Sequence, residues 1–292
     1  MADIAAASLT LNSHTFLWGT RTHVMGIINV TPDSFSGDGL GDDVVAAVDR
    51  GLALAREGAD ILDVGGESTR PGADPVSAEV EMRRVLPVIT ALRERTDLPI
   101  SIDTYKAEVA LAAMQAGAVM VNDVWGLRRD RRLAGVVAEG GATLIITHNR
   151  PAVPTVDALG GMYAGTAYID LVTEVRQELR ESVSWAETAG VPAGRIIVDP
   201  GLGFAKTPAQ NLVLLRSVAA FRDRYPVLIG PSRKSFIGRI LGVPAAERDE
   251  GTEAVVALVA AQGADIVRVH NVRAMVAVVR MVDAIMRGDH GR

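Results

Sequence analysis

The sequence "ADILDVGGESTRPGA" (residues 59–73) places a short apolar run directly before a polar loop. The run leads into Asp63, and two glycines then open into Glu, Ser, Thr, Arg and Pro. Four to six apolar residues without alternation are typical of a strand buried on both faces, as in a parallel sheet. A buried strand that leads into acidic, hydroxyl and guanidinium groups indicates a functional site at the strand tip.

The same pattern occurs eight times along the chain, and a segment with helical spacing follows each run. The runs are "VMGIIN" (24–29), "ADILDV" (59–64), "LPISID" (98–103), "VMVND" (119–123), "TLIITH" (143–148), "RIIVD" (195–199), "PVLIG" (226–230) and "DIVRVH" (265–270). The helical segments are 43–57, 77–94, 106–116, 131–139, 168–189, 208–221, 249–262 and 272–287. Several of them close with Gly before the next strand, as in "REGAD" and "AEGGAT", which is expected at helix C-termini.

Eight alternating β and α units predict a parallel sheet closed into a single (β/α)8 TIM barrel. We place this barrel at residues 24–292, after an N-terminal extension of residues 1–23. A doubly wound open sheet is the alternative, but it usually has fewer repeats, and no Gly-x-Gly-x-x-Gly motif opens the first helix. The longest connection, 149–167, is rich in Pro and Gly and lacks a helical period, so we expect it to be functional or mobile.

Composition narrows the class of protein. The 292 residues are 48% hydrophobic, which is enough for a sizeable core, and the net charge is only -5 with acids and bases mixed. This balance argues against binding to nucleic acid or to a membrane surface. The chain has no cysteine, so disulfides, thiolate metal sites and a Cys nucleophile are excluded. No apolar run reaches the roughly 18 residues of a membrane span, and no secretion signal is recognisable, so we expect a cytoplasmic protein.

Polar or ionisable groups end every predicted strand. In a TIM barrel the C-terminal ends of the strands share one face, where catalysis takes place. Helix capping would explain any one of these groups, but eight on one face indicate a ring of site residues. They are Asn29, Asp63, Asp103, Asn122 with Asp123, His148, Asp199, residues 232–235, and Arg268 with His270.

Three of these residues are short acceptors: Asp103, Asn122 and Asp199. Short side chains deep in a barrel suit a small flat heterocycle with several N–H donors. A carboxylate can accept two parallel hydrogen bonds from an amino-pyrimidine edge, and such charge-assisted pairs are strong. The alternative interpretation is buried polar scaffolding.

A second group is cationic or suited to anions. Strands 7 and 8 supply several of its members, and the loops after these strands are the usual phosphate site of the fold. The sequence "GPSRKSFIG" (230–238) also opens a helix, whose backbone N–H groups can bind an anion. We therefore expect a phosphate or pyrophosphate here, the alternative being a solvated basic rim. The group comprises Arg70, Lys234, Arg268 and His270, with Thr69 and Ser235.

Magnesium is the metal ion that the sequence leads us to expect. The five histidines show no helical ligand spacing, so a tightly held zinc is not expected. Mg²⁺ carried in with a phosphate ester needs few protein ligands, and Asn29 and the loop containing Asp33 are candidates to contact it. Phe35 is a candidate lid residue on the same loop, and Phe204 could lie against an aromatic ligand.

Seven motifs in order resemble the dihydropteroate synthase family over residues 24–287. They are "GIINVTPDSFS" (26–36), "DVGGESTRPGA" (63–73), "ISIDTYK" (100–106), "VNDVWG" (121–126), "IIVDPGLGFAKT" (196–207), "GPSRKSFIG" (230–238) and "IVRVHNV" (266–272). The resemblance implies a barrel that usually dimerises through its helices, so we expect a homodimer. It implies condensation of dihydropterin-methyl diphosphate with p-aminobenzoate in folate biosynthesis, with Mg²⁺ as cofactor.

The resemblance also implies roles for particular residues. The pterin pocket would be Asp103, Asn122, Asp199 and Lys234. The p-aminobenzoate pocket would be Thr69, Pro71, Phe204, Lys234 and Ser235. Thr69, Arg70, Arg268 and His270 would hold the diphosphate, and Asn29 would lie near Mg²⁺. The catalytic set would be Asn29, Arg70, Lys234, Arg268 and His270, with Asp33 and Phe35 on a lid loop.

The sequence departs from the commonest family pattern at four positions. Thr147 stands where Met is frequent, Leu202 where Phe is frequent, Ala205 in place of Gly, and Asn271 in place of Asp. These changes affect the shape of the pocket more than the reaction. Two further interpretations share the strand-tip acceptors: a pterin-dependent methyltransferase barrel, which needs no diphosphate site, and a non-catalytic pterin-binding paralogue.

Overall fold

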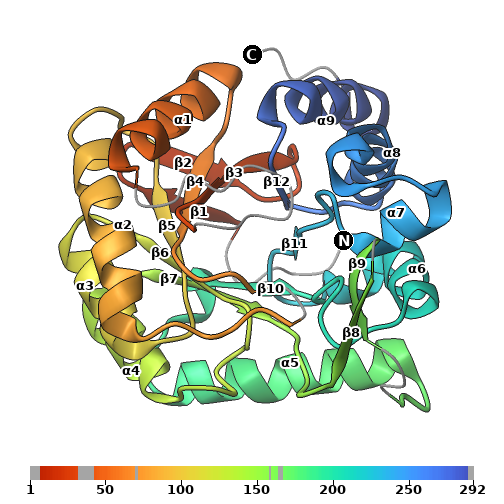
Figure 1. Ribbon diagram of the computed structural model, residues 1–292, viewed down its shortest axis with the longest axis horizontal. Helices are drawn as coiled ribbons and strands as arrows, with labels where there is room; N and C mark the ends of the chain where they lie inside the picture. The colour runs from red at the N-terminus through yellow and green to blue at the C-terminus, as the bar shows by residue number, and fades with distance from the viewer. Residues whose placement is uncertain (1–6, 32–42, 70–71, 158, 164–166, 289–292) are drawn as a thin grey trace.

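A computed structural model describes residues 7–31, 43–69, 72–157, 159–163 and 167–288. Its centre is an eight-stranded parallel sheet with the order β10-β7-β6-β5-β4-β3-β12-β11 (Figure 1). The two ends of this series meet, because Val198 of β10 pairs with Val227 next to β11 and its N–H donates to the Pro226 carbonyl at 2.9 Å. The predicted barrel is confirmed, and the open sheet is excluded. The strands are β3 His23–Asn29, β4 Ile61–Gly65, β5 Ile100–Asp103, β6 Met120–Asp123, β7 Thr143–Thr147, β10 Ile196–Asp199, β11 Leu228–Ile229 and β12 Ile266–Val269.

Helices surround the barrel, and each of the eight predicted helical segments contains one (Figure 1). Gly58 ends α1 with φ 101°, as its position in the sequence predicts. The segment predicted at 208–221 is shorter, because the α-helix ends at Arg216 and a 3-10 turn follows. The helices are α1 Val44–Glu57, α2 Ala78–Arg93, α3 Ala107–Gln115, α4 Arg132–Gly140, α5 Leu171–Thr188, α6 Pro208–Arg216, α7 Ser235–Leu241, α8 Asp249–Ala261 and α9 Val272–Arg287. None of these helices is long and apolar enough to cross a membrane.

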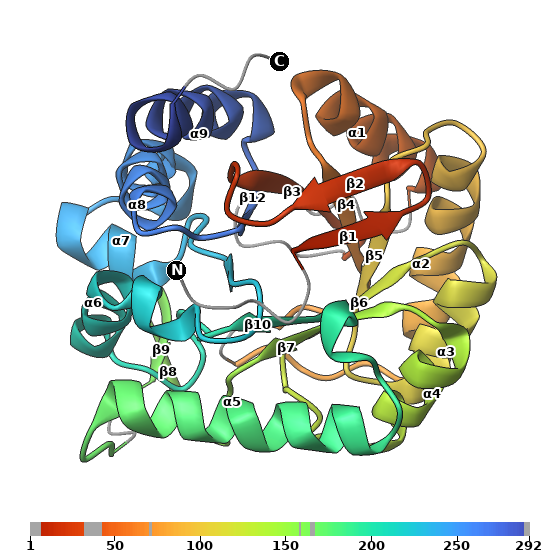
Figure 2. The ribbon, with the colours of Figure 1, turned by 180° about the vertical axis from the view of Figure 1, so that it is seen from behind.

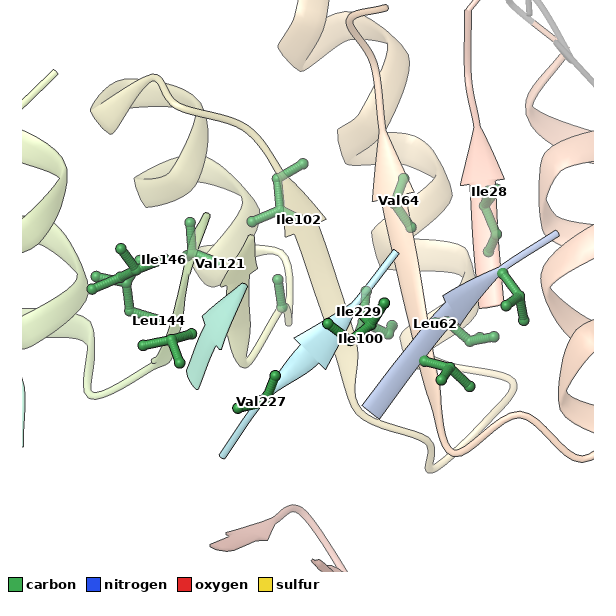
Figure 3. Close-up of a cluster of buried hydrophobic side chains, with 14 of the residues drawn as sticks. Ile28, Leu62, Val64, Ile100, Ile102, Val121, Leu144, Ile146, Val227 and Ile229 are labelled. Atoms are coloured by element: carbon green, nitrogen blue, oxygen red, sulfur yellow. The ribbon is translucent and has the colours of Figure 1, made fainter. Parts of the chain in front are cut away.

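The barrel strands bury both faces, but the two faces have different neighbours. One face packs against the helices and is apolar except for Asp123 at the end of β6, whose carboxylate accepts from the N–H groups of Trp125 and Leu127. Figure 3 shows part of the apolar cluster, including Leu62, Val64 and Ile102. Along each strand, the side chains of the inward face alternate with those of the outward face. The lower inward layer is apolar, with Ile61 and Met120 among its members, and the upper inward layer carries polar side chains such as Asn122. The absence of alternation in the sequence therefore reflects burial on both faces.

The N-terminal extension is part of the core. Its strands β1 Ser8–Leu11 and β2 His14–Leu17 form an antiparallel hairpin, which lies across the barrel in the view from behind (Figure 2). Leu9, Leu11, Phe16 and Trp18 join the lower inward layer of the barrel in one apolar cluster. The hairpin thus closes the end of the barrel opposite the C-terminal ends of the strands.

The long connection 149–167 is also structured in part. Strands β8 Pro154–Asp157 and β9 Gly160–Tyr163 pair as an antiparallel hairpin. Arg239 of α7 donates to both carboxylate oxygens of Asp157 at 2.9 Å, and Arg248 donates to the Leu159 carbonyl at 3.0 Å. These contacts fasten the hairpin to the side of the barrel that carries α7 and α8.

Truncation of Phe16 tests the role of the N-terminal hairpin. The side chain is 2% exposed, and its ring lies 4.8 Å from the ring of His23. We expect Phe16→Ala to lower the free energy of unfolding by about 3–4 kcal/mol because it opens a cavity at the end of the barrel. The neighbouring Leu17 is 50% exposed, so Leu17→Ala should cost about 0.5 kcal/mol or less. Urea denaturation measures both, and equal losses would show that the hairpin does not close the core.

Candidate active site

A pocket of about 670 Å³ opens at the C-terminal ends of the barrel strands. It unites the two groups of residues that the sequence singles out, the short acceptors and the anion-binding group. The residues of the predicted site that line it are Asn29, Thr69, Asp103, Asn122, Asp199, Phe204, Lys234, Ser235, Arg268 and His270. Arg70, Pro71, Asp33 and Phe35 lie outside the described residues.

The three short acceptors lie at the ends of β5, β6 and β10 and are almost completely buried. Asp199 Oδ1 accepts a hydrogen bond from the Gly201 N–H at 2.7 Å. Asp103 Oδ1 is buried and has no hydrogen-bond partner among the described residues. A buried acceptor without a donor is costly, so this atom is suited to an N–H group of a ligand.

Arg268 lies inside the pocket between two carboxylates. Its Nε donates to Asp63 at 2.5 Å and its Nη2 donates to Asp103 at 2.7 Å. Burial raises the pKa of Asp103, and the charge of Arg268 opposes that rise. The guanidinium is therefore already paired inside the pocket, in contrast to the free anion-binding group that its position near the end of β12 suggests.

The structure corrects the interpretation of Asp63 as a strand-tip residue. Asp63 lies in the middle of β4, is fully buried and points into the barrel, where Asn122 Nδ2 also donates to it at 3.2 Å. The polar tip of this strand is instead Gly65 and the loop after it. Asp63 thus orients Arg268 and Asn122 from below the pocket.

His270 is held between two strand ends. Its Nδ1 lies 2.8 Å from Ser232 Oγ, and its Nε2 lies 3.5 Å from Asn29 Nδ2. Burial lowers the pKa of His270 to about 3, with the charges of Arg233 and Arg268 adding to the effect. The imidazole is therefore neutral near pH 7, and it can serve the site as a hydrogen-bonding group and not as a cation.

Lys234 and Phe204 form one wall of the pocket. The Lys234 ammonium lies 4.3 Å from the centre of the Phe204 ring and donates to the Leu202 carbonyl. Burial lowers the pKa of Lys234 to about 8, and the Asp199 carboxylate opposes that shift. Helix α7 begins at Ser235, directly after this lysine, as the sequence predicts for the "GPSRKSFIG" motif.

A set of hydrogen bonds and ion pairs that holds the loop after β4 is not predicted from the sequence. The Lys106 ammonium bonds the carboxylates of Glu67, which lines the pocket, and Glu81, which is buried in α2. Arg84 donates to the Gly66 carbonyl at 2.9 Å. These bonds fix the start of the loop that carries Thr69. The Lys in "DTYK" is visible in the sequence, but its partners lie 25 and 39 residues away.

His148 does not line the pocket, so its interpretation as a site residue is wrong. It is buried behind the pocket wall, between Glu178 of α5 and Lys206. The hairpin β8–β9 does reach the pocket, through residues that include Val156 and Asp157. Sequence reasoning missed them because the connection has no recognisable motif.

The described residues contain no group of three or more His, Cys, Asp or Glu that could hold a metal ion. Asn29 fits a lesser role, because it lines the pocket beside His270 and its amide oxygen is a hard ligand. One such oxygen suits Mg²⁺ that arrives with a phosphate ester and keeps most of its waters.

Comparison with known proteins assigns the family. A family model described as pterin binding enzyme matches residues 25–270. The dihydropteroate synthase of Synechocystis sp. is 45% identical over 289 residues, which cover 98% of each chain. The chain belongs to the dihydropteroate synthase family.

Solved structures of dihydropteroate synthases share the fold. The Xanthomonas albilineans enzyme with 4-aminobenzoic acid superposes with a TM-score of 0.85 at 42% identity, covering 96% of this chain and 98% of that one. The Yersinia pestis enzyme in a sulfonamide drug complex superposes with a TM-score of 0.87 at 35% identity, covering 95% and 98%.

Of the four departures from the common dihydropteroate synthase pattern, one changes the pocket surface directly. Thr147 lines the pocket, whereas Leu202 is buried behind it. Ala205 has a left-handed backbone, with φ 50°, a conformation that favours glycine. Asn271 caps α9 through its side chain, which accepts from the Ala274 N–H at 3.3 Å.

The buried pair of Asp63 and Arg268 can be tested against an exposed pair. We expect Asp63→Asn to lower the free energy of unfolding by about 2 kcal/mol or more, because a buried guanidinium loses a charged acceptor. Asp223 contacts Arg180 at 2.6 Å on the surface, so Asp223→Asn should cost less than about 1 kcal/mol. Chemical denaturation of both variants measures the difference. A neutral Asp63→Asn would remove Asp63 from the support of the pocket.

Proposed function

We propose that the chain condenses 6-hydroxymethyl-7,8-dihydropterin diphosphate with p-aminobenzoate to give 7,8-dihydropteroate and diphosphate, a transferase reaction of folate biosynthesis. Membership in the dihydropteroate synthase family supports this function. The observation that carries it is a single pocket in which buried acceptors on β5, β6 and β10 face a set of cations. Such a pocket matches a substrate with a hydrogen-bond-donating ring at one end and an anion at the other.

The pterin ring is assigned to the acceptors Asp103, Asn122 and Asp199, with Lys234 beside them. An amino-pyrimidine edge carries several N–H groups, and a carboxylate can accept two of them in parallel. Asp103 Oδ1, which has no donor among the described residues, would gain one. Burial of the acceptors makes each of these hydrogen bonds stronger than it would be in water.

The p-aminobenzoate is assigned to the wall formed by Phe204, Lys234 and Ser235, together with Thr69. The family resemblance adds Pro71, which lies outside the described residues. The solved Xanthomonas albilineans relative contains 4-aminobenzoic acid, which supports a site for this compound. The Phe204 ring offers an apolar surface for the benzene ring, and the hydroxyls of Thr69 and Ser235 can donate to its carboxylate.

The reaction is a substitution at the exocyclic methylene of the pterin. The bond from this carbon to the diphosphate oxygen breaks, and its electron pair leaves with the diphosphate. The lone pair of the aniline nitrogen forms the new C–N bond, and that nitrogen releases a proton. Arg70 and Arg268 would stabilise the charge on the leaving group, with His270 as a neutral hydrogen-bond partner. Mg²⁺ bound with the substrate near Asn29 would neutralise further charge on the diphosphate.

The position of Arg268 links the two ends of the substrate. Its Nη2 donates to Asp103, which is one of the proposed pterin acceptors. Arg268 could reach the diphosphate by exchanging this bond for one to a phosphate oxygen, while Asp63 retains Nε. The N–H groups of the pterin would then replace the guanidinium on Asp103.

A turnover assay separates this function from its alternatives. Release of diphosphate from dihydropterin-methyl diphosphate and Mg²⁺, dependent on p-aminobenzoate and accompanied by dihydropteroate, would establish it. A methyltransferase barrel would not need the residues after β11 and β12, and a non-catalytic paralogue would be expected to lose some of them. Asn29, Thr69, Lys234, Arg268 and His270 all line the pocket. Pterin binding without release would favour the paralogue.

Replacement of Arg268 should separate turnover from pterin affinity. We expect Arg268→Ala to reduce turnover by about 100-fold or more, because the leaving group loses a preorganised cation. The affinity for 6-hydroxymethylpterin, which lacks the diphosphate, should change only a few-fold because Asp103 is freed from its internal partner. Steady-state kinetics and calorimetry measure the two effects. Equal losses of both would assign Arg268 to the pterin ring and not to the diphosphate.

A homodimer is proposed from the resemblance and from one surface of the structure. The helices α7, α8 and α9 expose large apolar side chains, among them Ile240, Leu258, Met281 and Ile285. A second copy of the chain is a suitable partner for such a face. Light scattering in solution would show the mass of a dimer. A cytoplasmic location also remains a proposal from the sequence.

A further inference from the structure

Lys206 is a buried lysine that the proposed reaction does not use. The chain has three lysines, and Lys206 is 2% exposed and does not line the pocket. Its Nζ lies 2.9 Å from the Gly201 carbonyl, 2.9 Å from the Phe204 carbonyl and 3.0 Å from His148 Nδ1. Each of the three N–H groups of an ammonium therefore has an acceptor at hydrogen-bond distance.

The hydrogen-bond partners of His148 also indicate that Lys206 is an ammonium. Its Nε2 lies 3.2 Å from Glu178 Oε2, so this nitrogen carries the proton and Nδ1 accepts from Lys206. Burial lowers the pKa of His148 to about 3, and the Lys206 charge adds to the effect, so the ring is neutral. A neutral amine at Lys206 has two N–H groups and would leave one of its three nearest acceptors without a proton; the His148 carbonyl oxygen is a fourth acceptor, at 3.4 Å. The contacts therefore favour an ammonium.

The backbone after Asp199 folds around this ammonium. Gly201, Gly203 and Ala205 have positive φ values of 74°, 76° and 50°, which alternate with ordinary residues. A Cβ at Gly201 would lie 1.9 Å from the His148 carbonyl oxygen, so no side chain fits there. This close turn brings the carbonyls of Gly201 and Phe204 onto one nitrogen.

The same backbone builds one side of the pocket. The Asp199 carboxylate accepts from the Gly201 N–H, the Leu202 carbonyl accepts from Lys234, and the Phe204 ring faces the Lys234 ammonium. Lys206 holds this segment from the side away from the pocket. A cation at this position also acts on the Asp199 carboxylate through a low-dielectric interior.

We propose that Lys206 is a positioning residue of the pterin site: its ammonium holds residues 201–204 in place and keeps the Asp199 carboxylate ionised for the pterin. The inference rests on the proposed assignment of Asp199 to the pterin. It adds a residue that does not touch the substrate and acts through two groups that do, Asp199 and Phe204.

The sign of the effect follows from the charges around Asp199. Burial raises the pKa of Asp199, and the charges of Lys234, Lys206 and Arg268, together with the Gly201 N–H, lower it. Asp199 accepts two N–H groups only when ionised, so pterin binding is present above this pKa and is lost as the pH falls through it. Without the Lys206 cation the pKa rises further, and the loss of binding moves to higher pH.

The charges around Lys206 show which groups still act on Asp199 when Lys206 is replaced. Burial lowers the pKa of Lys206, Asp199 and Glu178 raise it, and Lys234 and Arg150 lower it. In Lys206→Met, Lys234 and Arg268 still act on Asp199, so the shift in the pH dependence of pterin binding measures the contribution of the Lys206 cation alone. Asp103 also titrates in the pocket, and Asp199→Asn identifies which part of the pH dependence belongs to Asp199.

The test is calorimetry of 6-hydroxymethylpterin binding, without p-aminobenzoate, from mildly acidic to mildly alkaline pH. Lys206→Met and Lys206→Gln should move the acid loss of binding to higher pH by about one unit, which is about tenfold in affinity at the wild-type midpoint. The difference should shrink at alkaline pH. The control Arg222→Met removes a guanidinium that pairs with the buried Asp265 at 3.2 Å, outside the pocket. It should lower stability without moving the pH dependence.

Three outcomes would contradict the proposal. Affinity lowered equally at every pH in both Lys206 variants would show that Lys206 holds the loop but does not keep Asp199 ionised, and unchanged affinity would remove Lys206 from the site. Carbon-13 labelling of the three lysines gives a test in the wild-type protein, whether or not the variants fold. Burial lowers the pKa of Lys206 to about 7, so an ammonium signal is expected at mildly acidic pH, and a neutral amine signal there would overturn the proposal. A wild-type protein that binds no pterin would instead contradict the proposed function.

Discussion

Each barrel strand has to bury both of its faces, and its inward face changes from apolar to polar along its length. The lower inward layer, with Ile61 and Met120, packs against the N-terminal hairpin and excludes water from that end. The upper inward layer carries Asp63, Asn122 and Arg268, which would be costly inside a protein without partners. The pocket exists because these polar groups are held in a closed ring of strands whose other face is almost entirely apolar.

The polar layer is stable because its charges are paired across strands. Asp63 and Asp103 share Arg268, although they lie on β4 and β5 and the arginine lies on β12. On the opposite side, Asp199 lies near the cations Lys234 and Lys206. Both carboxylates proposed for the pterin, Asp103 and Asp199, therefore have a cation nearby before a ligand arrives. In the proposed reaction the pterin N–H groups would take the place of internal partners on the carboxylates, and the cations would face the anionic diphosphate.

Much of the fold and of the candidate site could be predicted from the sequence. The eight strands and their helices follow from local runs of residues. Asp103 and Asp199 line the pocket at the last position of their strands, and Asn122 lines it one position before the end of β6, whereas Asp123, which ends that strand, does not. The assignment of Asp63 and His148 to the site was wrong because the end of an apolar run does not show where a side chain points. Asp63 lies within its strand and points below the pocket, and His148 points away from it, toward Lys206.

The sequence by itself determined the barrel, the face that carries the site and the family, because strand periodicity and motif order are local properties of the chain. Only the tertiary structure decided which charges meet. The contacts of Arg268 with Asp63, of Lys106 with Glu81 and of Lys206 with the Gly201 carbonyl depend on the closure of the sheet and on left-handed turns. Pairing of buried charges is a long-range property, since each partner is selected by distance in space and not by separation along the chain.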